Sequence, residues 1–136
     1  VGNRFSDKFV LFSLLCQINF VLICVDKFIM DECPTKLRFA YLLYYSTSQR
    51  LEQINLQLNT KFVTNQDYIS VLFRNAMAHY KIGVSLRPYE INENDLLFGL
   101  TFKYFDCDYF EFKSKIFKEL VCLKEQIIAY LDLKRG

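Results

Sequence analysis

A chain of 136 residues is long enough for one domain with its own hydrophobic core. Apolar residues make up 52% of it, which excludes intrinsic disorder, and 4 glycines and 2 prolines are too few for the turns of an all-β sandwich. The formal net charge of +2 provides no strong basic field. This argues against tight non-specific RNA binding and leaves transient contact through a local cleft open.

The cysteines and the other chemical motifs point away from metal or cofactor chemistry. Five cysteines occur without a Cys-x-x-Cys pair, at Cys16, Cys24, Cys33, Cys107 and Cys122. We expect reduced thiols in the core rather than a disulfide framework or a zinc site. The sequence contains no phosphate-binding glycine loop, metal-ligand cluster or serine triad, so no cofactor is expected. The first residues, Val1-Gly2, leave open that the chain is part of a longer protein.

The first element is the uncharged stretch 9–25. A membrane span needs about 20 apolar residues, and three polar side chains interrupt this one: Ser13, Gln17 and Asn19. We therefore predict a helix buried on most sides, which opens at Ser6 and carries Asp7 in its first turn. A membrane or export segment is the alternative interpretation.

The second element, from Pro34 onward, has the clearest amphipathic pattern in the chain. Apolar and small residues recur at three- and four-residue steps: Leu37, Ala40, Tyr41, Tyr44, Thr47, Leu51, Ile54 and Leu58. We predict that this stripe faces the core. The opposite face is predicted to be solvated, with Lys36, Arg50, Glu52 and Gln53.

The third helix is predicted to start near Thr64, after a short connection at 59–63. Thr64 is a suitable N-cap, and Asp67 favours the positive end of a helix. Its predicted core stripe consists of Ile69, Leu72, Phe73, Ala76 and Tyr80. Gly83 follows the helix, and residues 85–91 with Pro88 exclude regular helix.

The fourth helix is predicted to start at Asn92 and to be short, with a joint at 106–108. The last helix has its predicted core positions at Phe110, Phe117, Leu120, Leu123, Ile127 and Leu131. The many aromatic residues between 98 and 112 are expected to pack in the core rather than to stack on bases. We therefore predict an all-α fold in which residues 1–136 form one domain, with about five helices in an up-and-down bundle.

The only histidine of the chain is His79, five residues after Arg74 and four after Asn75. Residues four apart share a helix face, so the Asn75 amide is placed to orient the imidazole. Arg74 lies about 140° round the helix from His79. This arrangement, Arg74-Asn75-(three residues)-His79, resembles the Arg-x4-6-His motif of the HEPN superfamily of small all-helical domains.

The resemblance implies a metal-independent endoribonuclease of a toxin–antitoxin or phage-defence system in the cytoplasm. In that family His79 would be the acid/base, Arg74 the phosphate clamp and Asn75 an auxiliary polar residue, acting on RNA through its 2′-hydroxyl. An antitoxin or a nucleotidyltransferase is the partner it implies. The tyrosine that such a partner modifies stands two places after the histidine in one subgroup, whereas here Tyr80 follows directly and Lys81 is second.

Dimerisation is predicted from the side of the third helix away from its core stripe. Val71, Met77 and Ala78 are small or apolar there, and a second molecule docking on them would explain the pattern. The resemblance to HEPN ribonucleases also implies a dimer, because those enzymes typically dimerise so that the motifs of the two copies meet in one composite cleft.

Two other interpretations remain open. Arg74 can be an ordinary surface residue and His79 a hydrogen-bonded residue at the edge of the core. The function would then be that of a non-catalytic helical domain that binds a partner protein or a nucleotide.

Overall fold

The computed structural model describes residues 4–28, 33–79 and 99–133. The elements in chain order are α1 (Arg4–Asn19), the π-helix η1 (Phe20–Phe28), α2 (Pro34–Leu58), the short 3-10 helix η2 (Gln66–Tyr68), α3 (Val71–His79), α4 (Leu100–Phe105) and α5 (Tyr109–Leu133). Within these ranges no residue is in a strand. The all-α prediction is confirmed.

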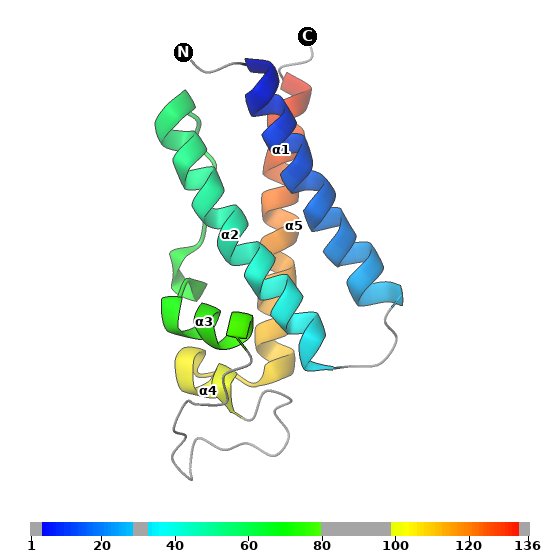
Figure 1. Ribbon diagram of the computed structural model, residues 1–136, viewed down its shortest axis with the longest axis vertical. Coiled ribbons are helices and arrows are strands. Elements are labelled where there is room, and N and C mark those ends of the chain that lie inside the picture. Colours follow the sequence, from blue (N-terminus) through cyan, green and yellow to red (C-terminus); the bar gives the residue numbers. More distant parts are fainter. Residues whose placement is uncertain (1–3, 29–32, 80–98, 134–136) are drawn as a thin grey trace.

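Three long rods form the body of the molecule: α1 with η1, α2, and α5 (Figure 1). The short helices α3 and α4 lie together beside one end of α5 (Figure 1). Helices α2 and α5 run in the same direction and α1 runs in the opposite one, because the segment 59–70 returns along the molecule with only one turn of helix in it (Figure 1). Strict up-and-down alternation of the long helices is therefore not observed.

Helix α2 buries the stripe that its periodicity predicts. Seven of the eight positions are buried, and the eighth, Leu58, is partly buried. The start of the helix is also as predicted, with Pro34 in its first turn, and Asn59 ends it in the left-handed region at φ 55°. Its apolar stripe forms the centre of the core, in contact with η1, α3 and α5.

The prediction that Lys36 is solvated is wrong. Its side chain is buried, and its Nζ donates to the backbone carbonyl of Asp26 at 3.3 Å, near the end of η1. The carboxylate of Asp26 also pairs with Lys113 of α5, at 3.3 Å. A lysine near the C-terminal end of a helix satisfies a carbonyl that has no partner inside the helix. These two lysines fix the end of η1 to α2 and α5.

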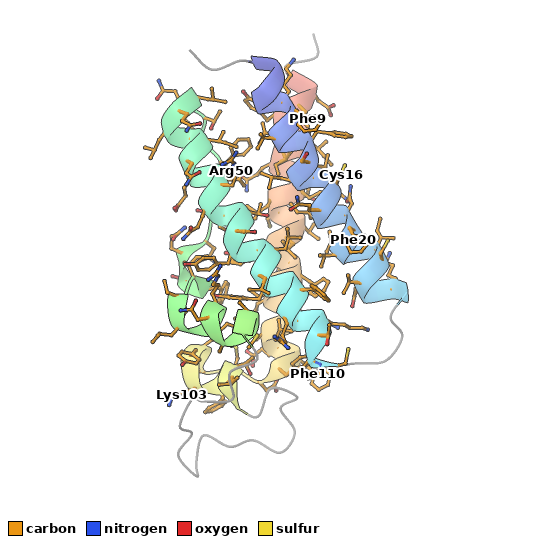
Figure 2. All side chains as sticks on the ribbon, viewed as in Figure 1. Phe9, Cys16, Phe20, Arg50, Lys103 and Phe110 are labelled. Atoms are coloured by element: carbon orange, nitrogen blue, oxygen red, sulfur yellow. The ribbon has the colours of Figure 1, made fainter. Side chains whose placement is uncertain are left out.

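The first helix is not buried on most sides, contrary to the prediction. Only 28% of the apolar segment Lys8–Lys27 is buried. Its inner side packs on α5 through Leu11, Leu14 and Ile18, while its outer side carries the exposed residues Phe9, Phe12, Cys16, Phe20, Ile23 and Cys24 (Figure 2). Among the described helices it alone is long and apolar enough to cross a membrane, a property that core helices and signal sequences share. The helix also begins at Arg4, so Ser6 lies inside it rather than at its cap.

The cysteines differ from the prediction as well. All five are free thiols, but only Cys107 is buried, and Cys16, Cys24 and Cys122 are exposed. Burial raises the pKa of the Cys107 thiol, which keeps it protonated and unreactive. The prediction of core thiols is therefore wrong for the three exposed cysteines.

The third helix starts later than predicted. Asn65 rather than Thr64 acts as a cap, and its side chain accepts from the backbone N–H of Asp67 at 2.9 Å to begin η2, not α3. Helix α3 has its own cap, because Ser70 Oγ accepts from the backbone N–H of Phe73 at 3.2 Å. The predicted fourth helix is described only from Leu100, and its proposed start at Asn92 lies outside the described residues.

Candidate functional site

Helix α3 is anchored to the core by Phe73, the residue directly before Arg74. The Phe73 ring is fully buried and lies edge-on to four aromatic rings, with centroid distances of 4.7 Å to Tyr41, 5.0 Å to Phe105, 5.4 Å to Phe112 and 5.8 Å to Tyr104. Edge-to-face pairs of this kind add to the free energy of burial. Phe105 and Phe112 therefore act as core, as predicted for the aromatic residues between 98 and 112, and the cluster fixes the rotation of α3 about its axis. The prediction is wrong for Phe102 and for Phe110, the first predicted core position of the last helix, because these side chains are 43% and 52% exposed.

A buried arginine holds the other end of α3. Arg38 of α2 donates to the backbone carbonyl of Met77 from Nε at 2.9 Å and from Nη2 as well. A guanidinium from another helix thus binds a backbone carbonyl near the end of the described part of α3. Met77 is only two residues before His79, so Arg38 positions the backbone at the end of the motif.

Arg74 lies on the solvent side of α3 and is held by neutral groups. Its Nη1 donates to Asn75 Oδ1 at 3.1 Å, and its guanidinium carbon lies 5.9 Å from the centre of the Tyr45 ring on α2. A cation over an aromatic face is stabilised at this distance. Both contacts orient the guanidinium without neutralising it, so it keeps its charge for an anionic ligand.

Arg74 borders a cleft of about 470 Å³ between α2 and α3. The cleft is lined by Leu42, Tyr45, Ser46, Gln49, Arg50, Gln53, Arg74 and Ala78. The lining includes two guanidinium groups, two amides and two hydroxyls, and none of the described lining residues carries a carboxylate. Such a surface is suited to a polar anion.

A second cleft of about the same volume lies on the other side of α2, toward η1. Its lining is Cys16, Gln17, Phe20, Val21, Val25, Phe39, Leu42, Leu43 and Ser46. None of these described lining residues is charged, so the cleft offers contacts to apolar groups and little to position a reacting phosphate. The cleft toward α3 is therefore the candidate site.

The structure brings two of the three predicted catalytic residues together. Arg74 and Asn75 are in contact, with the Asn75 oxygen accepting from Arg74. His79 is the last described residue of α3. The side chain of His79 lies outside the described residues, as do Tyr80 and Lys81.

The predicted dimer surface needs one correction. Val71 and Ala78 are exposed, but Met77 is buried within its own chain, 1% exposed, so it belongs to the core. Leu72, predicted to be a core residue, is 66% exposed. Val71, Leu72 and Ala78 thus form the apolar exposed flank of α3. A nine-residue helix has too few turns for its periodicity to separate Leu72 from Met77.

Two residues of the site were not predicted from the sequence as functional. Arg50 was expected to be an ordinary solvated residue, and Tyr45 was not singled out. Tyr45, Gln49 and Gln53 follow four-residue steps along α2, beside the buried stripe, and Arg50 lies next to Gln49. A polar stripe flanking an apolar one is the signal that could have pointed to them.

The tyrosines beneath the site are protonated at all physiological pH values. Burial raises the pKa of Tyr41 to about 12, and burial with the nearby Glu119 carboxylate raises the pKa of Tyr44 further. The Tyr41 hydroxyl donates to the carbonyl of Tyr68 at 2.8 Å and accepts from the Ser70 N–H at 3.1 Å. These hydroxyls fasten the segment before α3 to α2 and take no part in proton transfer.

The sequence matches no protein-family model, and no curated protein or solved structure matches it either.

Proposed function

We propose that the chain is a HEPN-like, metal-independent endoribonuclease of a toxin–antitoxin or phage-defence system, active in the cytoplasm as a homodimer. The observation that carries the proposal is the Arg74 guanidinium, held by Asn75 and Tyr45 at the edge of a polar cleft and five residues before His79. The type of reaction is inferred from the resemblance of Arg74-Asn75-(three residues)-His79 to the HEPN motif.

The reaction needs two proton transfers and a cationic group that stabilises the negative charge developing on the phosphate oxygens. The ribose 2′-oxygen forms a bond to the adjacent phosphorus while the bond from phosphorus to the 5′-oxygen breaks. His79 takes the proton from the 2′-hydroxyl, and the His79 of a second copy delivers one to the leaving oxygen. Arg74 binds the phosphate oxygens and stabilises their developing charge. The products are a 2′,3′-cyclic phosphate and a 5′-hydroxyl.

Cleavage of RNA in excess EDTA tests the proposal. We expect the parent and the control Lys118→Ala, which removes an exposed cation of α5, to produce cyclic phosphate ends. Arg74→Ala and His79→Ala should each reduce the rate by about 10²-fold or more. Arg74→Lys keeps the positive charge but removes the planar guanidinium, so its cleavage rate should stay well below that of the parent. Equal rates in all five proteins would contradict the proposal.

The dimer is tested by the exposed flank of α3. Leu72→Lys should give a monomer in sedimentation and remove cleavage, since the composite cleft needs two copies. Leu56→Lys is the matched control, because Leu56 is 86% exposed on α2, away from α3. A parent that is monomeric and fully active at micromolar concentration would contradict the dimer.

A second candidate function is a non-catalytic module that binds a partner protein. The exposed apolar side of α1 and η1 favours it, because such patches mark interaction sites. A module of this kind would keep partner binding when Arg74 or His79 is replaced, and it would not cleave RNA.

A further inference from the structure

The cleft between α2 and α3 contains a second arginine, Arg50, that the motif does not include. It lies on α2 beyond the level of α3 (Figure 2). The α2 residues that line the cleft run from Leu42 to Gln53, which corresponds to about 16 Å of helix. The cleft is therefore longer than a site for a single phosphate.

Both guanidinium groups keep their charge available. Arg50 contacts the neutral Gln53 amide at 3.5 Å, and Arg74 contacts the neutral Asn75 amide. Among the described residues neither is paired with a carboxylate. The neighbouring carboxylate of Glu52 accepts from the Gln66 amide at 2.7 Å and from the Thr64 hydroxyl at 3.4 Å, so it is directed toward the segment 59–70.

The other polar groups of the cleft lining suit the rest of a nucleotide. Gln49, Gln53 and Ser46 are exposed and provide both donors and acceptors. Sugar 2′-hydroxyls and the edges of unstacked bases need such groups. A cleft between two helices admits one strand, whereas duplex RNA is bound across a wider surface.

We propose that Arg50 and Arg74 bind successive phosphates of one RNA strand, so that the substrate is an extended single strand lying along α2. In this arrangement Arg74 holds the phosphate that reacts and Arg50 holds a neighbouring one. Arg50 is then a substrate-binding residue rather than a catalytic one. This inference rests on the proposed function for its choice of RNA as the ligand.

Binding is measured apart from cleavage with a fluorescent 2′-O-methyl oligouridylate, which has no free 2′-hydroxyl to react. Each neutralised phosphate of a single strand contributes about −0.7 to the slope of log K against log salt. We expect Arg50→Ala to make the slope shallower by about 0.7 and the double variant with Arg74→Ala by about 1.4. Arg50→Lys should keep the slope of the parent, because it keeps the charge.

Lys118→Ala is the control for the general charge of the protein, and thermal unfolding checks that each variant is folded. A duplex of the same length should bind more weakly than the single strand. An unchanged slope in Arg50→Ala, an equal change in Lys118→Ala, tighter duplex binding, or no binding by the parent at low salt would each overturn the inference.

The two proposals fail in different ways. If the slopes change as expected but no RNA is cleaved, the binding site is correct and the nuclease is not. If RNA is cleaved equally by the parent and Arg50→Ala, and the slope is unchanged, the nuclease is correct and Arg50 is not part of its site.

Discussion

The first and second long helices have the same length, but the solvent-facing side is polar in one and apolar in the other. The 16 residues of α1 and the 9 of η1 match the 25 of α2. In α2, charged and amide residues mark the solvent-facing side, so the buried stripe can be predicted as the side without them. In the segment 9–25 no charge marks any side, and the exposed side is as apolar as the buried one. A lack of charge therefore indicates burial only where a polar face exists for contrast.

The largest expected effect comes from removing leucines that are fully buried in either helix. Leu11→Ala in α1 and Leu51→Ala in α2 should each lower the free energy of unfolding by about 2–5 kcal/mol, since both side chains are 0% exposed. Phe12→Ala, beside Leu11 and 55% exposed, and Leu56→Ala should cost less than about 1 kcal/mol. Urea unfolding measures all four. A large loss in Phe12→Ala would mean that the outer side of α1 is covered in solution.

The next effect concerns the hydroxyls of the α2 stripe. Tyr41→Phe leaves the Tyr68 carbonyl and the Ser70 N–H without this partner, and Tyr44→Phe does the same to the Asn65 carbonyl, which accepts at 2.6 Å. Each change should cost about 1–3 kcal/mol of unfolding free energy, again by urea titration. The ring packing stays, so a loss above this range would show that more than hydrogen bonding has changed.

The same hydroxyls predict a loss of stability at high pH. Folding keeps the Tyr41 phenol protonated and raises its pKa from 10.0 to about 12, so its contribution is complete below the unfolded value. It is lost as the pH rises from about 10 through about 12. The urea midpoint of the parent should fall over this window more steeply than that of Tyr41→Phe. Parallel curves would contradict the prediction.

The smallest expected effect is a gain in the free energy of unfolding. Thr47 lies within the apolar stripe at 0% exposure, and its hydroxyl has no hydrogen-bond partner among the described residues. Thr47→Val should raise the free energy of unfolding by about 0.5–1 kcal/mol, because an unpaired buried hydroxyl is unfavourable. A fall in the thermal midpoint would indicate that the hydroxyl has a partner in solution.

The helices themselves were predicted better from the sequence than the contacts between them. The start of α2 at Pro34, its stripe and the last helix follow from local patterns. Lys36 was misplaced because its partner, the Asp26 carbonyl, belongs to another element. The start of α3 was misplaced because Thr64, Asn65 and Ser70 are all chemically suitable caps, and only tertiary contacts choose among them.

The candidate site shows the same division. The contact between Arg74 and Asn75 is between neighbours in the chain, so a local motif contains it. Arg50 and Tyr45 reach the cleft only because α2 packs against α3. The polar stripe beside the buried one marks these residues as candidates. It does not specify which flank of α2 packs against the motif, so the cleft itself is known only from the fold.

The contact between Arg38 and the Met77 carbonyl has a consequence for the order of folding. It joins residues 39 positions apart, and a helix of nine residues is too short to be stable alone in water. The backbone at the end of the motif therefore becomes ordered only after α2 and α3 have docked. A nascent or partly unfolded chain would have no organised site, so the proposed nuclease activity would begin only when folding is complete.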